Sequence, residues 1–299
     1  MSENQLPQER PLLRRVFISP DEPRLRAGWR LLLHILLLII FGLIFGLAAV
    51  FFGRFLNGSI ASILNQIVNF LIITSSVYVA RRWLDKRSFE SLGLKLDQYT
   101  LIDILSGIGI TFVQMGLIYL LMLSLGWLTF NGFAWEVDPI NLVITNVLTF
   151  FVVFIFVGWN EELLSRGYQL QTIASGLNLF WGMILSSAVF GLLHLGNPNA
   201  TWVSAAGIFF AGVFLAYGYI RTKQLWLPIG LHLGWNFFEG VGFGFPVSGL
   251  DIYALTRITV HGPELWTGGA FGPEAGLIVL PALLLGALLI YLCTMRRAS

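Results

Sequence analysis

The sequence has little charge and almost no cysteine. Only 11% of its 299 residues are Asp, Glu, Lys or Arg, whereas 56% are hydrophobic. This balance excludes an ordinary soluble domain of this length. The single cysteine, Cys293, excludes an internal disulfide. We also find no internal repeat, no low-complexity tract and no room for a separate soluble domain.

Several processing and catalytic signatures are missing as well. A cleavable signal peptide needs a short apolar stretch and a small-residue cleavage site, and neither occurs before Ala27. No serine lies in a nucleophile-elbow motif, and Cys293 has no histidine nearby in the sequence. The metalloprotease pattern His-Glu-x-x-His is also absent. The absence of a serine nucleophile elbow and of a histidine near Cys293 disfavours nucleophilic catalysis by serine or cysteine.

What the sequence has instead is a series of long apolar blocks. Blocks of about 20 residues are long enough to cross a bilayer as α-helices, and spanning segments must be helical to satisfy their backbone groups. We therefore predict an all-α, polytopic membrane protein with about eight transmembrane helices. The predicted spans are 28–53, 58–80, 101–126, 141–165, 178–195, 201–220, 226–245 and 274–294.

The basic residues between these blocks are distributed unequally, and they predict an orientation. If both termini lie in the cytoplasm, the basic residues of 1–27, 81–95, 221–223 and 296–297 share one side, and only Arg54 and Arg257 lie on the other. Cytoplasmic loops carry such an excess of Lys and Arg. We predict a cytoplasmic basic tail over 1–27, one transmembrane domain over 28–294 and a cytoplasmic tail over 295–299. The short loops favour a prokaryotic plasma membrane.

Three polar clusters interrupt the apolar blocks. Ionisable groups inside a span are costly and mark candidate sites. The clusters are Trp159-Asn160-Glu161-Glu162-Leu163-Leu164-Ser165-Arg166-Gly167, Phe190-Gly191-Leu192-Leu193-His194, and His232-Leu233-Gly234-Trp235-Asn236. By contrast, we expect His34 to be a packed or interfacial histidine and His261 to lie in an exposed outer loop.

Helical spacing gives these clusters a predicted geometry. Residues four apart share a helix face, so Glu162 can pair with Arg166, and His232 and Asn236 project to one side. Glu161 then faces a cavity. Glu161 and His194 are almost equally far from the turn at 175–178, so an antiparallel helix pair brings them to similar depth, within about 3 Å. If Arg166 marks the cytoplasmic interface, all three clusters can meet in the cytoplasmic half of the bilayer.

Two chemistries fit this set of residues. Amide hydrolysis needs an activated water and donors for the developing oxyanion. Glu161 is the candidate general base with His194, while His232 and Asn236 are candidate oxyanion donors. Alternatively, Glu161, His194 and His232 could bind catalytic zinc. The plain alternative to both is a buried polar network that ties four helices together.

The three clusters resemble the motifs of the CPBP or Abi family of CAAX prenyl endopeptidases and bacteriocin-processing proteins. The resemblance covers about residues 140–245 and rests on Glu161-Glu162-x-x-x-Arg166, Phe190-x-x-x-His194 and His232-x-x-x-Asn236. It implies an eight-span fold with a site open toward the cytoplasm. It also implies an endopeptidase in which Glu161 and His194 activate water and His232 and Asn236 form the oxyanion hole, without an obligatory metal.

The resulting hypothesis is an intramembrane endopeptidase. Its expected partners are the lipid bilayer and a membrane-associated protein or peptide substrate, prenylated or not, and no nucleic acid. The alternative from another class is a non-catalytic immunity or scaffold protein that keeps the pocket for binding. A transporter with a carboxylate relay is a third reading, against which the lack of inverted-repeat symmetry argues.

Overall fold

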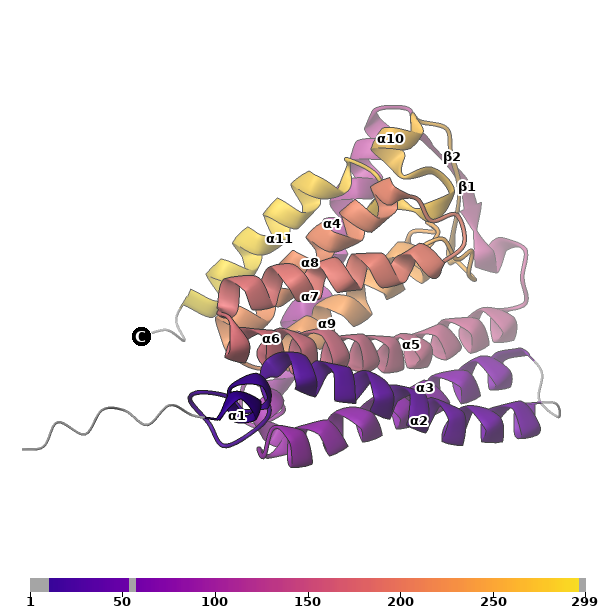
Figure 1. Ribbon diagram of the computed structural model, residues 1–299. Helices are drawn as coiled ribbons and strands as arrows, with labels where there is room; N and C mark the ends of the chain where they lie inside the picture. The colour runs from indigo at the N-terminus through magenta and orange to yellow at the C-terminus, as the bar shows by residue number, and fades with distance from the viewer. Residues whose placement is uncertain (1–10, 54–57, 296–299) are drawn as a thin grey trace, which may run out of the picture.

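The computed structural model describes residues 11–53 and 58–295, and most of them are helical (Figure 1). The first ten residues of the basic tail, with Arg10, and also Arg54, Arg296 and Arg297, lie outside the described residues. The longer helices are α2 (Ala27–Gly53), α3 (Gly58–Val79), α4 (Thr100–Ser124), α5 (Ile140–Glu162), α7 (Leu179–Leu193), α8 (Trp202–Thr222), α9 (Trp226–Asn236) and α11 (Val279–Thr294). The short helices α1 (Leu12–Phe17), α6 (Gln171–Gly176) and α10 (Glu264–Thr267) lie between or before them.

The helices agree with the predicted membrane architecture. Within the described residues, six helices are long and apolar enough to cross a membrane, and α11 is a shorter apolar helix. The fold class is therefore confirmed, whereas the count of eight crossings stays a prediction. Two helix boundaries differ from the ends of the predicted spans. Where a span was predicted to begin at 274, helix α11 begins at Val279, after a turn of 3₁₀-helix over Pro273–Ala275. Where a span was predicted to end at 165, the helix continues to Gly176.

Three of the membrane helices continue as π-helix. The π-helical segments are Ala80–Leu84 after α3, Leu163–Leu170 after α5 and Phe237–Gly242 after α9. The second begins directly after Glu162, inside the first predicted motif, and the third begins directly after Asn236, the end of the last motif. Such widened turns are rare and occur often at functional sites, because they change the direction of the side chains that follow.

The turn between α6 and α7 reverses the chain, as the sequence predicts. Asn178 caps α7, with its side-chain oxygen accepting a hydrogen bond from the backbone N–H of Trp181 over 3.0 Å. This cap satisfies one of the donors that a helix leaves unpaired at its first turn. The reversal brings α7 back along the end of α5, with which it shares the site.

The end of the bundle opposite α6 carries a small sheet that the all-helical prediction missed. Strand β1 (Leu128–Phe133) pairs antiparallel with β2 (Thr256–Val260), and α10 lies beside them (Figure 1). The sheet fixes the long segment between α9 and α11 to the segment between α4 and α5. Consequently, the segment predicted to be an exposed outer loop is partly folded onto the bundle.

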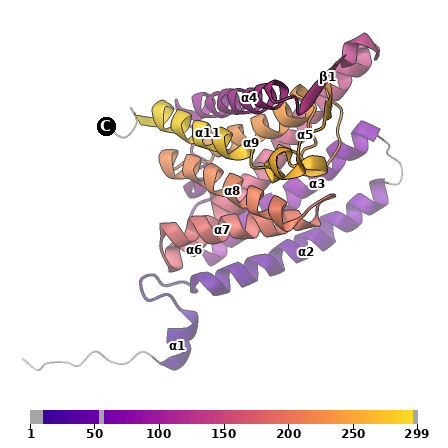
Figure 2. The ribbon, with the colours of Figure 1, turned by 90° about the horizontal axis from the view of Figure 1, so that it is seen from above.

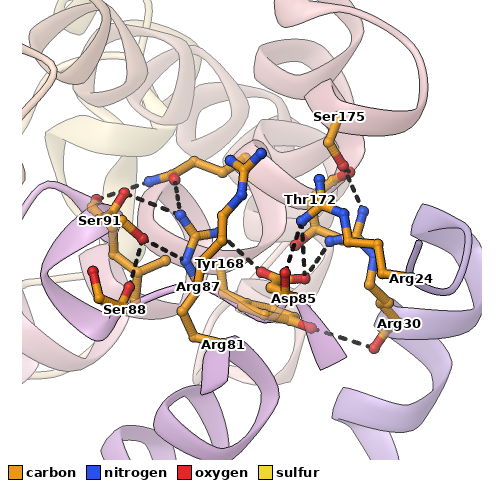
Figure 3. Close-up of polar contacts among 12 residues, drawn as sticks. Arg24, Arg30, Arg81, Asp85, Arg87, Ser88, Ser91, Tyr168, Thr172 and Ser175 are labelled. Atoms are coloured by element: carbon orange, nitrogen blue, oxygen red, sulfur yellow. Dashed lines mark hydrogen bonds and ion pairs between the residues drawn. The ribbon is translucent and has the colours of Figure 1, made fainter. Parts of the chain in front are cut away.

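A charged cluster fastens the N-terminal segment to the bundle end that carries α6. Arg24, Arg30 and Arg81 converge on the carboxylate of Asp85 (Figure 3). All four residues are buried. Arg30 also donates to Ser175 Oγ over 2.6 Å. The cluster therefore joins α2, the end of α3 and α6, whereas α1 stands away from the helices (Figure 2).

The apolar core is divided among several clusters around the candidate site. One cluster includes Met115, Leu231 and Ala282, which belong to α4, α9 and α11. Helices α4 and α9 approach closely at Gly107 and Gly230. A Cβ on Gly230 would lie 2.3 Å from the backbone oxygen of Ile104, so only glycine permits this approach. Helix α9 is thus held in the middle of the bundle.

Candidate active site

Three helices bring the four predicted site residues together around one cavity. Glu161 comes from the end of α5, His194 follows α7, and His232 and Asn236 lie one turn apart on α9. All four line a cavity of about 420 Å³, a size typical of ligand sites. Most of its other walls are apolar. The convergence predicted from helix lengths and spacing is therefore present.

Glu162 and Arg166 form the ion pair that their spacing predicts. Arg166 Nη1 donates to Glu162 Oε1 over 2.7 Å, and Arg166 Nη2 donates to the carbonyl oxygen of Gly212 over 3.0 Å. The guanidinium also lies over the ring of Phe190, 4.4 Å from its centroid. Glu162 and Arg166 are both fully buried. The ion pair therefore connects α5 and the π-helical segment after it to α7 and α8.

Arg166 is enclosed by protein and does not lie at the end of its helix. The argument from sequence placed Arg166 at the cytoplasmic interface. In the structure, its side chain is enclosed by protein, and the helical path continues for ten residues beyond it to Gly176. Glu161 therefore lies about 22 Å along the helical path from Gly176, at 1.5 Å per residue. The depth of the site in the bilayer stays a prediction.

Glu162 also orients the imidazole of His232. The Nδ1 atom of His232 donates to Glu162 Oε1 over 2.7 Å, because a carboxylate oxygen can only accept. This bond turns Nε2 toward Glu161, with Nε2 and Glu161 Oε2 3.7 Å apart. A proton on Nε2 as well would make His232 an imidazolium, which the carboxylate of Glu162 favours. In that form Nε2 can donate a hydrogen bond.

His194 is fixed in the complementary way. Its Nδ1 donates to the carbonyl oxygen of Phe190 over 2.8 Å, which leaves Nε2 of the neutral ring as an acceptor. That Nε2 atom lies 3.8 Å from Glu161 Oε2. Glu161 Oε2 is enclosed and accepts no hydrogen bond from any described residue. The separation is too long for a direct hydrogen bond but suits a bridging water.

The helix break after His194 forms part of the cavity wall. Asn197 lines the cavity, and its Nδ2 donates to the carbonyl oxygen of Ser248 over 3.1 Å. Asn199 occupies the left-handed region, with φ 57°, and its Nδ2 donates to the carbonyl oxygen of Gly249. The irregular backbone is therefore held by protein groups, as non-helical chain at membrane depth must be.

The cavity also contains residues that the sequence did not identify. Ser248 and Glu274 come from the segment between α9 and α11, and both line the cavity with the four predicted residues. Ser248 lies outside the predicted spans and Glu274 is only the first residue of the predicted span 274–294, so no sequence pattern linked them to the motifs. By contrast, His34 is packed as predicted, with its ring 4.2 Å from that of Tyr168, and His261 is exposed.

The zinc alternative makes a demand on the arrangement of possible ligands. Catalytic zinc requires His nitrogen and carboxylate oxygen ligands at about 2.0–2.2 Å from one point. Over residues 11–53 and 58–295, no group of three or more His, Cys, Asp or Glu side chains is arranged to hold a metal ion. The choice between a glutamate mechanism and a metal mechanism at Glu161, His194 and His232 stays a prediction, and the mechanism below contains no step at a metal.

Comparisons with known proteins agree with the three motifs. The family model described as "Type II CAAX prenyl endopeptidase Rce1-like" matches residues 143–238, a segment that contains Glu161, His194, His232 and Asn236. The family resemblance is confirmed over this segment. Together with the long apolar helices, it identifies the chain as an integral membrane protein.

A curated protein of Bacillus subtilis (strain 168), described as "Putative membrane peptidase YdiL", is 35% identical over 78 residues. The match covers 26% of this chain and 30% of that protein, so the similarity spans less than a third of either. No solved structure matches the chain.

Proposed function

We propose that this protein is an intramembrane endopeptidase that hydrolyses peptide bonds of membrane-associated proteins or peptides. The proposal rests above all on one arrangement: Glu161 Oε2 faces Nε2 of His194 and Nε2 of His232, 3.8 and 3.7 Å away, inside a largely apolar cavity. The family resemblance and the peptidase named among the relatives support the same reaction class.

In the proposed mechanism, Glu161 and His194 activate the attacking water. A water held by Glu161 Oε2 gives up a proton as its oxygen attacks the scissile carbonyl carbon. Nε2 of His194 is the acceptor that the Phe190 hydrogen bond leaves free, so it can position that water or share its proton. Glu161 then returns the proton to the leaving amine, and the peptide C–N bond breaks.

His232 and Asn236 stabilise the negative oxygen of the tetrahedral intermediate. The amide of Asn236 supplies one donor from the cavity wall. Nε2 of His232 supplies the second when the ring carries both protons, a state that the Glu162 carboxylate favours. Donors fixed in a site that excludes bulk water are effective because they need no reorganisation as charge develops.

An experiment with purified protein tests the proposal. The wild-type protein and Glu161→Gln are each reconstituted in liposomes and mixed with a membrane fraction from cells that carry only Glu161→Gln, in which uncut substrates should accumulate. We expect new peptide termini, measured by mass spectrometry, with the wild-type protein alone. Equal sets of termini with both proteins would reject the proposal in favour of a binding or immunity role.

A further inference from the structure

A second carboxyl group besides that of Glu161, belonging to Glu274, faces the cavity from outside the three motifs. It belongs to the short helix Pro273–Ala275 before α11 and lines the cavity together with Glu161, His194 and Asn236. Only 5% of the residue is exposed. The mechanism above assigns it no task, although a buried carboxyl group beside a reaction centre is costly to keep.

Ser248 holds one oxygen of this carboxyl group in place. Glu274 Oε2 accepts hydrogen bonds from the backbone N–H of Ser248 over 3.0 Å and from its Oγ over 2.6 Å. Ser248 itself occupies the left-handed region, with φ 47°. Among the described residues, none donates a hydrogen bond to the other oxygen, Oε1. The side chain is therefore fixed at one oxygen and keeps the other for a ligand.

Glu274 interacts electrostatically with His194 and His232 in the cavity but has no strongly basic partner among the described residues. No described Lys or Arg forms an ion pair with it, and the buried Arg166 is already paired with Glu162. A second carboxyl group, that of Glu239, is fully buried nearby, and neither of its oxygens has a hydrogen-bond partner in the described part of the chain. Its Oε1 lies 3.4 Å from the point where a Cβ on Gly272 would be. A basic side chain that entered the cavity would give Glu274 the ion-pair partner that no described Lys or Arg supplies.

The apolar walls of the cavity suit the hydrocarbon stem of a lysine or arginine side chain. Val247, Leu250 and Ile252 line the same cavity from the segment that carries Ser248. Lysine and arginine combine an apolar stem with a charged end, so they can pack along such walls while the charge reaches a carboxylate.

We propose that Glu274, held by Ser248 and facing the cavity from helix Pro273–Ala275, binds a lysine or arginine side chain of the substrate close to the scissile bond. This inference rests on the proposed endopeptidase function and adds a specificity to it. Glu274 is a substrate-binding residue in this account, and the bond-breaking steps remain with Glu161, His194, His232 and Asn236.

The test uses quenched fluorescent peptides and the full-length protein in liposomes. Each peptide has the same alanine–leucine sequence with Lys, Arg, Gln or Glu at one position, moved stepwise along the chain. For one position, we expect the wild-type kcat/KM for Lys or Arg to exceed that for Gln by at least about tenfold, as for a close charge pair. Glu274→Gln should reduce this preference to within about twofold, mainly by raising KM for the basic peptides.

Two further variants control for folding and for a general effect of charge. Glu264→Gln removes an exposed carboxylate from the same segment, outside this cavity, and should leave the preference unchanged. Ser248→Ala keeps the charge of Glu274 but removes its hydroxyl donor, and should weaken the preference less than Glu274→Gln does. If Glu274→Gln does not fold, Ser248→Ala decides alone: a reduced preference for Lys or Arg over Gln supports the site, and a wild-type preference contradicts it.

Binding measurements separate this inference from the proposed function. Fluorescence anisotropy of labelled Lys and Gln peptides is compared for Glu161→Gln and for Glu161→Gln/Glu274→Gln, neither of which needs to cut. A preference for the Lys peptide that is lost in Glu161→Gln/Glu274→Gln supports the cation site. If the wild-type protein nevertheless cleaves no peptide, the endopeptidase function alone is rejected. Cleavage without any basic preference, or a preference that survives Glu274→Gln, would overturn the cation site alone.

Discussion

His232 Nδ1 donates to Glu162 Oε1 over 2.7 Å, and this one bond assigns different tasks to two adjacent carboxylates. Glu162 is fully buried between His232 and Arg166, whereas Glu161 is partly exposed in the cavity, facing the histidine Nε2 atoms. Glu162 therefore orients the site, and Glu161 is free to meet water and substrate.

Removing either member of the buried pair Glu162–Arg166 should destabilise the protein. Glu162→Ala leaves Arg166 without its countercharge, and Arg166→Ala does the same to Glu162, each at a cost of about 3–5 kcal/mol. We expect a lower Tm in detergent and a low yield for both variants. A wild-type yield and Tm from both would refute the structural role of the pair.

The sequence predicted the meeting of Glu161, His194 and His232 because helix spacing and equal distances from a turn determine it. It did not predict the burial of Arg166, since apolar periodicity does not show whether a charged residue lies at a membrane interface or is enclosed by protein. Nor did it predict Ser248 and Glu274. Ser248 lies between predicted spans and Glu274 at the very start of one, and the path of this segment depends on contacts with Asn197 and with the β1–β2 sheet.

Asn236→Ala should slow the reaction without unfolding the protein. Asn236 lies in the cavity wall, so its truncation removes one oxyanion donor while the helix remains intact. Loss of one such donor costs about 10²–10³ in kcat. Steady-state kinetics should show this fall with little change in KM. A rise in KM at an unchanged kcat would mean that Asn236 binds substrate and does not act on the oxyanion.

His194→Asn tests the acceptor role of Nε2. The asparagine amide can replace the Nδ1 donor to the carbonyl oxygen of Phe190, but it has no atom at the place of Nε2. We expect a wild-type Tm and a fall in kcat of about 10²–10⁴, the range for lost acid–base catalysis. Activity within a few-fold of wild type would show that Glu161 needs no partner in activating the water.

Asp85→Asn should weaken the attachment of the N-terminal segment, because Arg24, Arg30 and Arg81 share that one carboxylate. The expected loss is about 3–5 kcal/mol, measured as a fall in Tm. Glu22→Gln is the matched control: Glu22 pairs with Arg24 and Arg87 but is 41% exposed, and its loss should cost no more than about 1 kcal/mol. Equal Tm shifts for the two variants would contradict the assignment.

Zinc content separates the glutamate mechanism from the metal alternative. We expect elemental analysis of purified, active protein to give far less than one zinc per chain, and chelation to leave peptide cleavage unchanged. One equivalent of zinc that rises and falls with activity would assign Glu161, His194 and His232 to metal binding instead.

The account depends most on Glu161, so the most direct test compares peptide termini across whole cells. Cells carrying the wild-type protein, Glu161→Gln or the control Glu90→Gln, which changes an exposed carboxylate, are analysed at equal protein abundance. We predict a set of termini near membrane anchors or lipidated ends that occurs with wild type and Glu90→Gln and is absent with Glu161→Gln. The same termini in all three, at equal levels, would contradict catalysis by Glu161.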